Sequence, residues 1–348
     1  MLDHLGVSRV AVAIGGSMGG MAVLEWPLCS PPGYIRHIVP LATSARHSAW
    51  CISWGETQRQ SIYSDPTYDD GYYVSQPSSG LAAARMAALL TYRSRDSFES
   101  RFGRRPQAAP AADPPHAMPI LPLALSAADQ ALIAHNEGHQ RASRAQSQAQ
   151  SPSQTTPHSP VSERGPSFTP PAPQPVFSAQ SYLRYQGAKF VARFDANCYI
   201  HITRKMDTHD LARGRGALLS STANFSHLVD PQSSEAQSAA LAAVLATLPP
   251  RALVISIETD GLFTPTEQRE LATHIPGAEL VVIPSPDGHD GFLLEFEQIN
   301  AHVLGFLKRE LPAYYVPEEG EELELELDDF SIKKTSLFGE AEADVTRW

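Results

Sequence analysis

The chain has few cysteines and no long apolar run, and each absence argues against a class of protein. Since the first residues show neither a basic stretch nor an apolar core, we also expect no secretory signal peptide. Three cysteines among 348 residues form an odd, widely spaced set. Such a set argues against a disulfide framework and a metal site, and it favours a reducing compartment. No apolar stretch reaches the ~18 residues of a membrane span. We therefore expect a cytoplasmic protein that holds no metal.

Basic clusters are also absent, although the chain is strongly charged. The formal net charge is -11, and no sustained run of Lys and Arg occurs. We therefore expect no binding to nucleic acid or to an acidic membrane surface. Much of the negative charge falls in residues 318–329, within an acidic tail at 312–348 that we interpret as solvated.

What is present is an order of apolar segments that predicts an α/β fold with a mostly parallel sheet. Strands are expected at 7–16, 35–41, 252–258 and 278–284, with helices between them. The first strand is almost entirely apolar from Val10 to Ile14, which predicts burial on both faces. Because the sheet begins abruptly, we expect an upstream part of the domain to be missing.

Composition divides the chain into four parts. Residues 1–45 are the first part of the core, 46–250 a helical lid region, 251–311 the second part of the core, and 312–348 the tail. Within the lid region, residues 105–175 are dominated by Pro, Ala, Ser and Gln. Such sequence buries too little apolar surface to order itself, so a disordered insertion is predicted there.

The motif that carries chemistry runs from Gly15 to Gly20. It satisfies G-x-S-x-G around Ser17 and lies between a predicted strand and a predicted helix, as a nucleophile elbow requires. Such a turn exposes the serine hydroxyl above the sheet, and the backbone N–H of Met18 would be one oxyanion donor. The alternative is a glycine-rich turn with a helix-capping serine.

A serine hydroxyl needs a base, and the order of this fold is serine, then acid, then histidine. Asp260 follows the third predicted strand and His289 follows the fourth, at the ends where α/β sheets gather their sites. We predict that His289 accepts the Ser17 proton and that Asp260 orients the imidazole. Rival carboxylates remain nearby at positions 258, 287 and 290.

At these residues the sequence resembles the fungal homoserine O-acetyltransferase family, whose fold is that of the α/β-hydrolases. The resemblance rests on five long stretches: GGSMGGMAVLEW, HSAWCISWGETQRQSIYSDP, LLTYRSRDSFESRFG, SYLRYQGAKFVARFDANCYIHITRKMDTHD and SPDGHDGFLLEF. It implies a ping-pong transfer of an acetyl group from acetyl-CoA, a substrate, to L-homoserine in methionine biosynthesis, with no cofactor.

The same resemblance implies further roles. Ser17, Asp260 and His289 match the family triad, Arg93 the arginine that binds the substrate carboxylate, and Asp290 the acid that binds its amino group. It also implies a possible homodimer. Since the family carries a further N-terminal segment with a second oxyanion donor, we expect this chain alone to have little or no activity.

Two other functions stay open at this point. A serine hydrolase or esterase would use the same triad and pass its acyl group to water. A non-catalytic fragment that serves only as an interaction surface is the second alternative. The acyl donor, acetyl or succinyl, and the acceptor are not fixed by the residues themselves.

Overall fold

The computed structural model describes residues 2, 4–106, 135, 177–215 and 233–315. The predicted insertion and acidic tail lie almost entirely outside these residues. The chain divides into two units, one made of residues 1–103 and 182–347, the other of 104–181 with Trp348. In the second, the described residues include an antiparallel bridge between Pro106 and Phe177. The site and its surroundings belong to the first unit.

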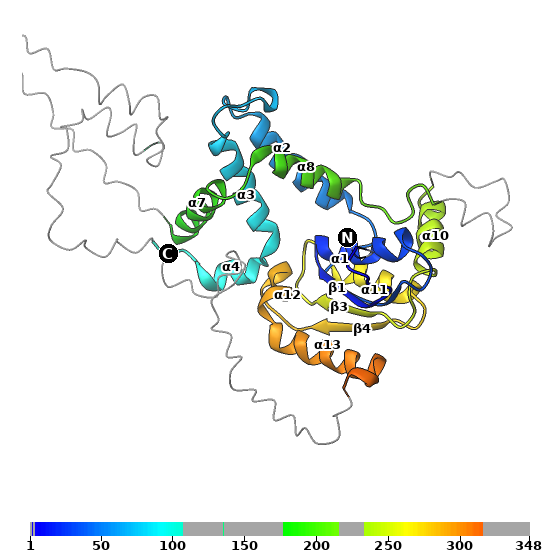
Figure 1. The fold of residues 1–348 in the computed structure, drawn as a ribbon. Coiled ribbons are helices and arrows are strands. Elements are labelled where there is room, and N and C mark those ends of the chain that lie inside the picture. The colour runs from blue at the N-terminus through cyan, green and yellow to red at the C-terminus, as the bar shows by residue number, and fades with distance from the viewer. Residues whose placement is uncertain (1, 3, 107–134, 136–176, 216–232, 316–348) are drawn as a thin grey trace, which may run out of the picture. The chain divides into compact units, whose positions relative to one another are not determined.

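The centre of this unit is a four-stranded sheet in the order β1-β2-β3-β4 (Figure 1). All pairings are parallel, which confirms the predicted fold class. The carboxyl ends of the strands therefore meet at one edge, where α/β folds place their sites. The strands are β1 (Val10–Gly16), β2 (Ile35–Leu41), β3 (Leu253–Ile257) and β4 (Glu279–Ile283).

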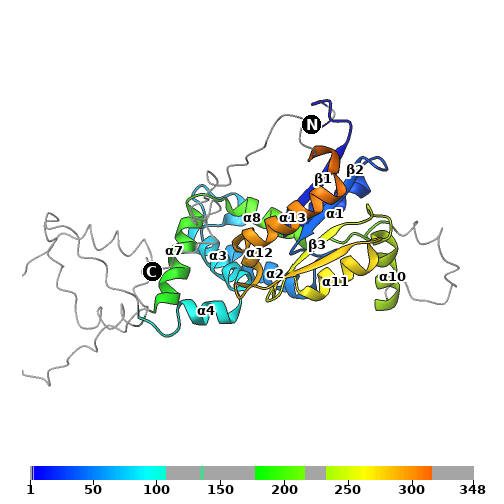
Figure 2. The same ribbon diagram turned by 90° about the horizontal axis from the view of Figure 1, so that it is seen from below.

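Helices cover both faces of the sheet (Figures 1 and 2). Along β3 the side chains alternate, so Val254 joins one apolar cluster while Ile255 joins the other. The first cluster includes side chains of three helices, α1 (Met18–Glu25), α10 (Ser234–Leu245) and α11 (Pro265–His274). The second includes α13 (Phe296–Glu310).

The remaining helices, which we call the lid helices or the lid, have an apolar cluster of their own. The lid helices are α2 (Ala49–Tyr63), α3 (Ser78–Tyr92), α4 (Arg95–Arg101), α7 (Ser178–Val191) and α8 (Ala196–Asp207). Short elements are η1 (Trp26–Cys29), η2 (Asp69–Gly71), η3 (Gly288–Asp290), α12 (Gly291–Leu294) and η4 (Pro312–Tyr314). Within the described part of the chain, every helix is too short or too polar to cross a bilayer.

The structure differs from the sequence prediction at the first strand. β1 lies at an edge of the sheet and pairs with β2 alone among the described strands. Ile14 is therefore 47% exposed, so the prediction that this strand is buried on both faces is wrong. β3, which is flanked on both sides, is buried along its whole length. An apolar run predicts a strand, but its place in the sheet decides how much of it is covered.

Glycines allow β1 and α1 to approach closely at the turn that joins them. A Cβ on Gly15 would lie 2.5 Å from the carbonyl oxygen of Gly19 and 2.9 Å from Cγ2 of Val23. A Cβ on Gly20 would lie 2.6 Å from Cβ of Thr43. The turn can therefore form only with hydrogen at these positions.

We predict that Gly15→Ala destabilises the protein, because the new methyl group meets backbone that cannot move aside. The expected loss is ~1–3 kcal/mol, the usual range for overpacking a core. Gly305→Ala is the matched control, since a Cβ at this exposed position in α13 meets nothing within 4 Å. It should raise stability slightly through helix propensity. Urea unfolding of both variants measures this, and equal midpoints would contradict the prediction.

Candidate active site

Ser17 occupies the turn between β1 and α1 in a conformation that few residues adopt. Its φ is 55° and its ψ is -125°, in the region that disfavours side chains. Its backbone N–H donates to the carbonyl of Leu41 on β2 at 2.9 Å, and its carbonyl accepts from Oγ1 of Thr43 at 2.8 Å. The surrounding hydrogen bonds thus hold a strained backbone, as is common at reactive residues.

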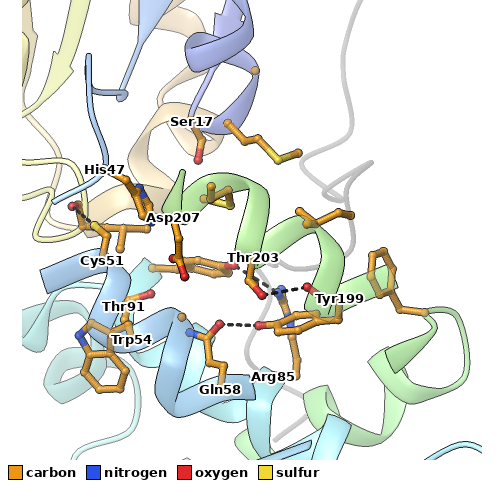
Figure 3. Close-up of a pocket in the computed structure, with 18 of the residues that line it drawn as sticks. Ser17, His47, Cys51, Trp54, Gln58, Arg85, Thr91, Tyr199, Thr203 and Asp207 are labelled. Atoms are coloured by element: carbon orange, nitrogen blue, oxygen red, sulfur yellow. Dashed lines mark hydrogen bonds between the residues drawn. The ribbon is translucent and has the colours of Figure 1, made fainter. Parts of the chain in front are cut away.

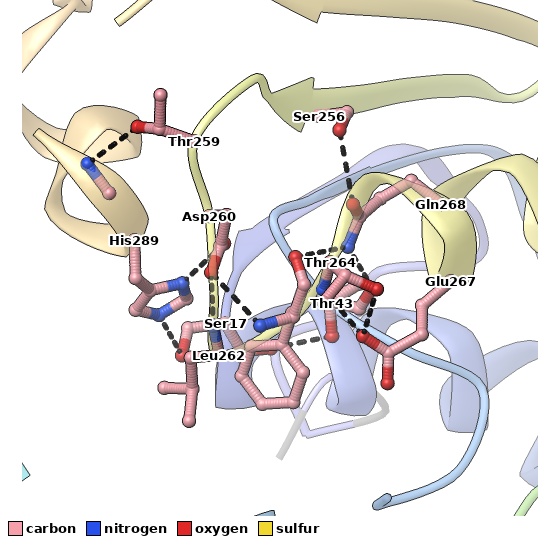
Figure 4. Close-up of polar contacts among 12 residues, drawn as sticks. Ser17, Thr43, Ser256, Thr259, Asp260, Leu262, Thr264, Glu267, Gln268 and His289 are labelled. Carbon is pink, nitrogen blue, oxygen red and sulfur yellow. Dashed lines mark hydrogen bonds and ion pairs between the residues drawn. The ribbon is translucent and has the colours of Figure 1, made fainter. Parts of the chain in front are cut away.

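The structure brings Ser17, His289 and Asp260 into one chain of hydrogen bonds (Figure 4). Nε2 of His289 lies 2.9 Å from Oγ of Ser17, and Nδ1 lies 2.7 Å from Oδ2 of Asp260. Asp260 is 3% exposed and His289 is 4% exposed. This is the geometry that lets an imidazole take the proton of a serine while a carboxylate fixes its tautomer.

Asp260 is held rigidly on the side away from the histidine. Its Oδ1 accepts the backbone N–H groups of Leu262 at 2.8 Å and Phe263 at 2.9 Å. These bonds satisfy a buried charge and leave Oδ2 for the imidazole. Among the four candidate carboxylates, Asp260 is therefore the one that contacts Nδ1 of His289.

A buried amide connects the segments that follow β2 and β3. Gln268, 0% exposed on α11, donates to the carbonyls of Thr43 at 2.6 Å and Phe263 at 3.2 Å. Its oxygen accepts from the hydroxyl of Ser256 on β3 at 3.1 Å. Thr43 in turn donates to Ser17, so one network joins the serine turn to the loop of Asp260 (Figure 4).

A cavity of about 460 Å³ lies between the serine turn and the lid helices, and of the three hydrogen-bonded residues Ser17 is the one that lines it. Ser17 lies at one end and Gln58 and Tyr199 at the other (Figure 3). Most of the wall is apolar or aromatic, and a few polar groups project into it, as is typical of a small-molecule site. Met18 also lines it, directly beside Ser17, but its N–H as an oxyanion donor stays a prediction.

Two titratable groups in the cavity wall are kept neutral by burial. Desolvation, with smaller contributions from His209 and Arg59, lowers the pKa of His47 to about 4. Burial raises the pKa of the Cys51 thiol to about 11, and its Sγ donates to the carbonyl of Leu262 at 3.1 Å. Neither side chain therefore adds charge to the cavity wall beside Ser17 at neutral pH.

The cationic side chain in the cavity wall is Arg85 on α3. It is 4% exposed, its Nη1 lies 3.4 Å from the hydroxyl of Tyr92, and its Cζ lies 4.8 Å from the ring centroid of Phe190. The ring of Tyr92 lies 6.1 Å from that of His289, so this tyrosine stands between the arginine and the triad. A buried guanidinium at this position is suited to an anionic group of a substrate.

The two residues predicted to bind the substrate are placed differently from that expectation. Nε of Arg93 forms an ion pair with Oδ2 of Asp290 at 2.7 Å, and Nη1 forms another with Oδ1 of Asp287 at 2.8 Å. Neither Arg93 nor Asp290 is among the residues that line the cavity. The chain places them side by side as an ion pair, and their roles in binding the substrate stay a prediction.

Sequence analysis did not single out Arg85 as a residue of the cavity, although its position in an otherwise uncharged helix could have indicated it. It is the one charged residue of α3, a helix otherwise made of small, apolar and hydroxyl residues. An isolated charge in such a helix must be paired or used, because burying it without a partner is costly. Tyr92 follows seven positions later, two helical turns along the same face.

Comparison with known proteins places the chain in the class that this geometry suggests. The family described as alpha/beta hydrolase fold matches residues 1–296. Homoserine O-acetyltransferase of Cryptococcus neoformans var. grubii is 53% identical over 403 residues, which cover 100% of this chain and 74% of that protein. That of Saccharomyces cerevisiae is 46% identical and is covered over 70% of its length. The chain belongs to the homoserine O-acetyltransferase family of the α/β-hydrolase fold.

Solved structures share the fold at lower identity. Homoserine O-acetyltransferase from Bacillus anthracis superposes with a TM-score of 0.58 at 16% identity, over 88% of this chain and 62% of that one. Esterase E22 gives a TM-score of 0.55 at 16% identity, over 88% and 63%. The chain thus spans less than two thirds of the length of these structures.

We predict that Ser17→Ala abolishes labelling by a fluorophosphonate probe, because the probe reacts only with an activated serine. Asp260→Asn should slow labelling by about 10⁴-fold, the effect of presenting the wrong imidazole tautomer. Mass spectrometry of the labelled protein gives both the rate and the modified residue. Labelling that persists in Ser17→Ala would assign the nucleophile to another residue.

We also predict that His47 contributes to acid sensitivity. Its pKa in the folded protein, about 4, lies below its ordinary value of 6.5. Between these values the unfolded chain binds a proton that the folded chain does not, so stability falls as pH falls from 6.5 toward 4. Urea unfolding across this range should show that the free energy of unfolding falls less steeply with pH in His47→Gln. The difference in slope should correspond to at most about one bound proton. Parallel curves for the two proteins would exclude this role.

Proposed function

We propose that this chain transfers an acetyl group from acetyl-CoA to the hydroxyl of L-homoserine through an acetyl-serine intermediate. The observation that carries the proposal is the hydrogen-bonded arrangement of Ser17, His289 and Asp260 beneath a cavity that contains a buried arginine. Family membership supports the choice of donor and acceptor, and the proposed place in metabolism is methionine biosynthesis.

In the first half-reaction, Oγ of Ser17 attacks the thioester carbonyl while Nε2 of His289 takes the hydroxyl proton. The tetrahedral oxyanion forms beside the N-terminus of α1, and we propose the backbone N–H of Met18 as one of its donors. Collapse breaks the C–S bond, and the proton on His289 passes to the departing thiolate of coenzyme A. Acetylated Ser17 and free coenzyme A result.

In the second half-reaction, neutral His289 takes the proton of the acceptor hydroxyl, whose oxygen attacks the acetyl carbonyl. The new oxyanion collapses, Oγ of Ser17 leaves, and the proton on His289 returns to it. Asp260 stabilises the imidazolium in both halves through Nδ1. The product is the O-acetylated acceptor, and the enzyme regains its starting state.

For acceptor binding we propose Arg85, in place of Arg93, as the partner of the substrate carboxylate. Arg85 lines the cavity and is bracketed by aromatic rings, whereas Arg93 is bound by two aspartates outside it. For the amino group two carboxylates compete: Asp290, next to the catalytic histidine, and Asp207, which lines the cavity. Comparing the acceptor KM of Asp290→Asn and Asp207→Asn decides between them.

A cytoplasmic location and a possible homodimer are the remaining elements of the proposal. The first rests on the sparse cysteines, two of which, Cys29 and Cys198, are exposed as free thiols. The second rests on the family resemblance. Gel filtration with light scattering measures the oligomeric state directly.

The test separates acyl transfer from hydrolysis by following both half-reactions. With acetyl-CoA alone, we expect mass spectrometry to show acetylated Ser17; this detects slow chemistry, so the result does not depend on rapid turnover. Added L-homoserine should discharge the intermediate to O-acetylhomoserine with little free acetate. Discharge to acetate at the same rate with and without homoserine would indicate an esterase, and absence of the intermediate would contradict the mechanism.

We predict that Arg85→Met weakens binding of the acceptor without preventing formation of the acetyl-enzyme. Loss of a charge-assisted hydrogen bond is worth ~1.5–3 kcal/mol, which corresponds to a ~10–100-fold rise in the homoserine concentration needed for half-maximal discharge. Arg95→Met, an exposed arginine on α4, is the matched control and should behave as the parent chain. Equal behaviour of both variants would remove Arg85 from the acceptor site.

A further inference from the structure

The loop that carries the catalytic histidine is fastened to the lid. The histidine loop, residues 284–290, follows β4, and the lid segment, residues 93–101, joins α3 to α4 and includes α4. Oγ of Ser94 donates to the carbonyl of Pro286. A Cβ on Gly288, whose φ is 68°, would lie 2.5 Å from the backbone nitrogen of Ser94. The two backbones are therefore in direct contact, with no room for a side chain between them.

One carboxylate oxygen gathers most of the polar contacts across this junction. Oδ1 of Asp287 accepts from Oγ of Ser97 at 2.6 Å, Nη1 of Arg93 at 2.8 Å and Nη2 of Arg101 at 3.0 Å. Burial raises the pKa of Asp287, but Ser97 and the charges of Arg101 and Arg93 outweigh it, so the pKa lies below its ordinary value. Asp287 is thus an anion at neutral pH, bound by three donors from the lid segment.

Arg93 binds the histidine loop on both sides of the catalytic residue. Its Nη1 meets Asp287, two positions before His289, and its Nε meets Asp290, one position after it. Side chains of Arg93 and Asp290 are 5% and 7% exposed. A planar guanidinium held at two points restrains orientation as well as distance.

On the opposite side, the backbone of the histidine loop is held by hydrogen bonds of Thr259, at the end of β3. Oγ1 of Thr259 accepts from the N–H of Gly288 at 2.9 Å and donates to the carbonyl of Ser285 at 2.7 Å. Asp260 then contacts the imidazole itself. Among the described residues, the ion pairs of Asp287 and Asp290 in this loop come from the lid segment.

We propose that Arg93 and Asp287 are positioning residues that hold His289 within reach of Ser17 and couple this contact to α3. They touch no reacting atom and act through the imidazole. Arg93 is the residue that directly follows α3, and α3 also carries Arg85 and Tyr92 in the cavity wall. The helix that we propose to bind the acceptor therefore leads into the residue that positions His289. The proposal rests on the proposed roles of Ser17 and His289, but not on the identity of donor or acceptor.

The test is the rate at which a fluorophosphonate labels Ser17 in the full chain. Asp287→Ala should lower the maximal rate of labelling by about 10²-fold, the effect of a displacement of roughly 1 Å at a reacting group. The probe concentration for half-maximal rate should not change, because the cavity wall is untouched. The maximal rate of labelling of Asp287→Asn should lie between those of the parent chain and Asp287→Ala, since its amide oxygen still accepts hydrogen bonds but carries no charge.

Arg93→Met combined with Asp287→Ala should slow labelling much less than the product of the two single effects, as expected for partners in one contact. Arg215→Ala is the matched control, because it also breaks an ion pair, but one outside the histidine loop. This ion pair joins Nη2 of Arg215 to Oε2 of Glu25 at 2.7 Å. It should label at the parental rate. Circular dichroism of each variant confirms that labelling is measured on folded protein.

Four outcomes decide between these possibilities. Slower labelling of Asp287→Ala with an unchanged half-maximal concentration supports the proposal. Parental labelling of folded Asp287→Ala, or equal slowing of Arg215→Ala, overturns it. Labelling that survives Ser17→Ala is a different failure, since it removes the proposed nucleophile and with it the proposed function.

Discussion

The contact on which this site depends is the hydrogen bond between Ser17 and His289, residues 272 positions apart in the chain. Neither end is free to move. Ser17 is held in a positive-φ turn whose close packing requires glycine at positions 15 and 20, while His289 is held by its hydrogen bond with Asp260. A serine becomes nucleophilic only when a base is fixed beside it, so the surrounding structure is organised to keep this distance short.

Two kinds of interaction provide that rigidity. Beneath the triad, neutral hydrogen bonds through the buried amide of Gln268 connect the serine turn with the loop of Asp260. Beside it, ion pairs around Asp287 connect the histidine loop with the lid. The cavity itself is largely apolar, and burial keeps His47 and Cys51 uncharged there. The charge of Arg85 is therefore less screened than it would be in water.

Much of the fold and part of the site could be predicted from the sequence. Apolar periodicity located all four strands, and the glycines around Ser17 identified the elbow, because the packing of strand on helix is encoded locally. Asp260 and His289 were selected because they follow two predicted strands in the order acid then histidine, and parallel strands bring their carboxyl ends to one edge of the sheet. The edge position of β1 could not be predicted in this way, since burial depends on neighbours. Nor could the pairing of Arg93 with Asp290, two charges that sequence analysis had assigned to a ligand.

By itself, the sequence determined the class of fold, the turn that exposes a serine, and the types of residue available to activate it. Only the tertiary structure decided which carboxylate meets the imidazole, which arginine lines the cavity and which arginine fastens the loop. The reason is physical: propensity and periodicity act over a few neighbouring residues, whereas an ion pair forms between whichever charges the folded chain brings within a few ångströms. Arg85 and Arg93 are eight positions apart, about two helical turns. Arg85 lines the cavity, whereas Arg93 forms an ion pair with Asp287 of the histidine loop.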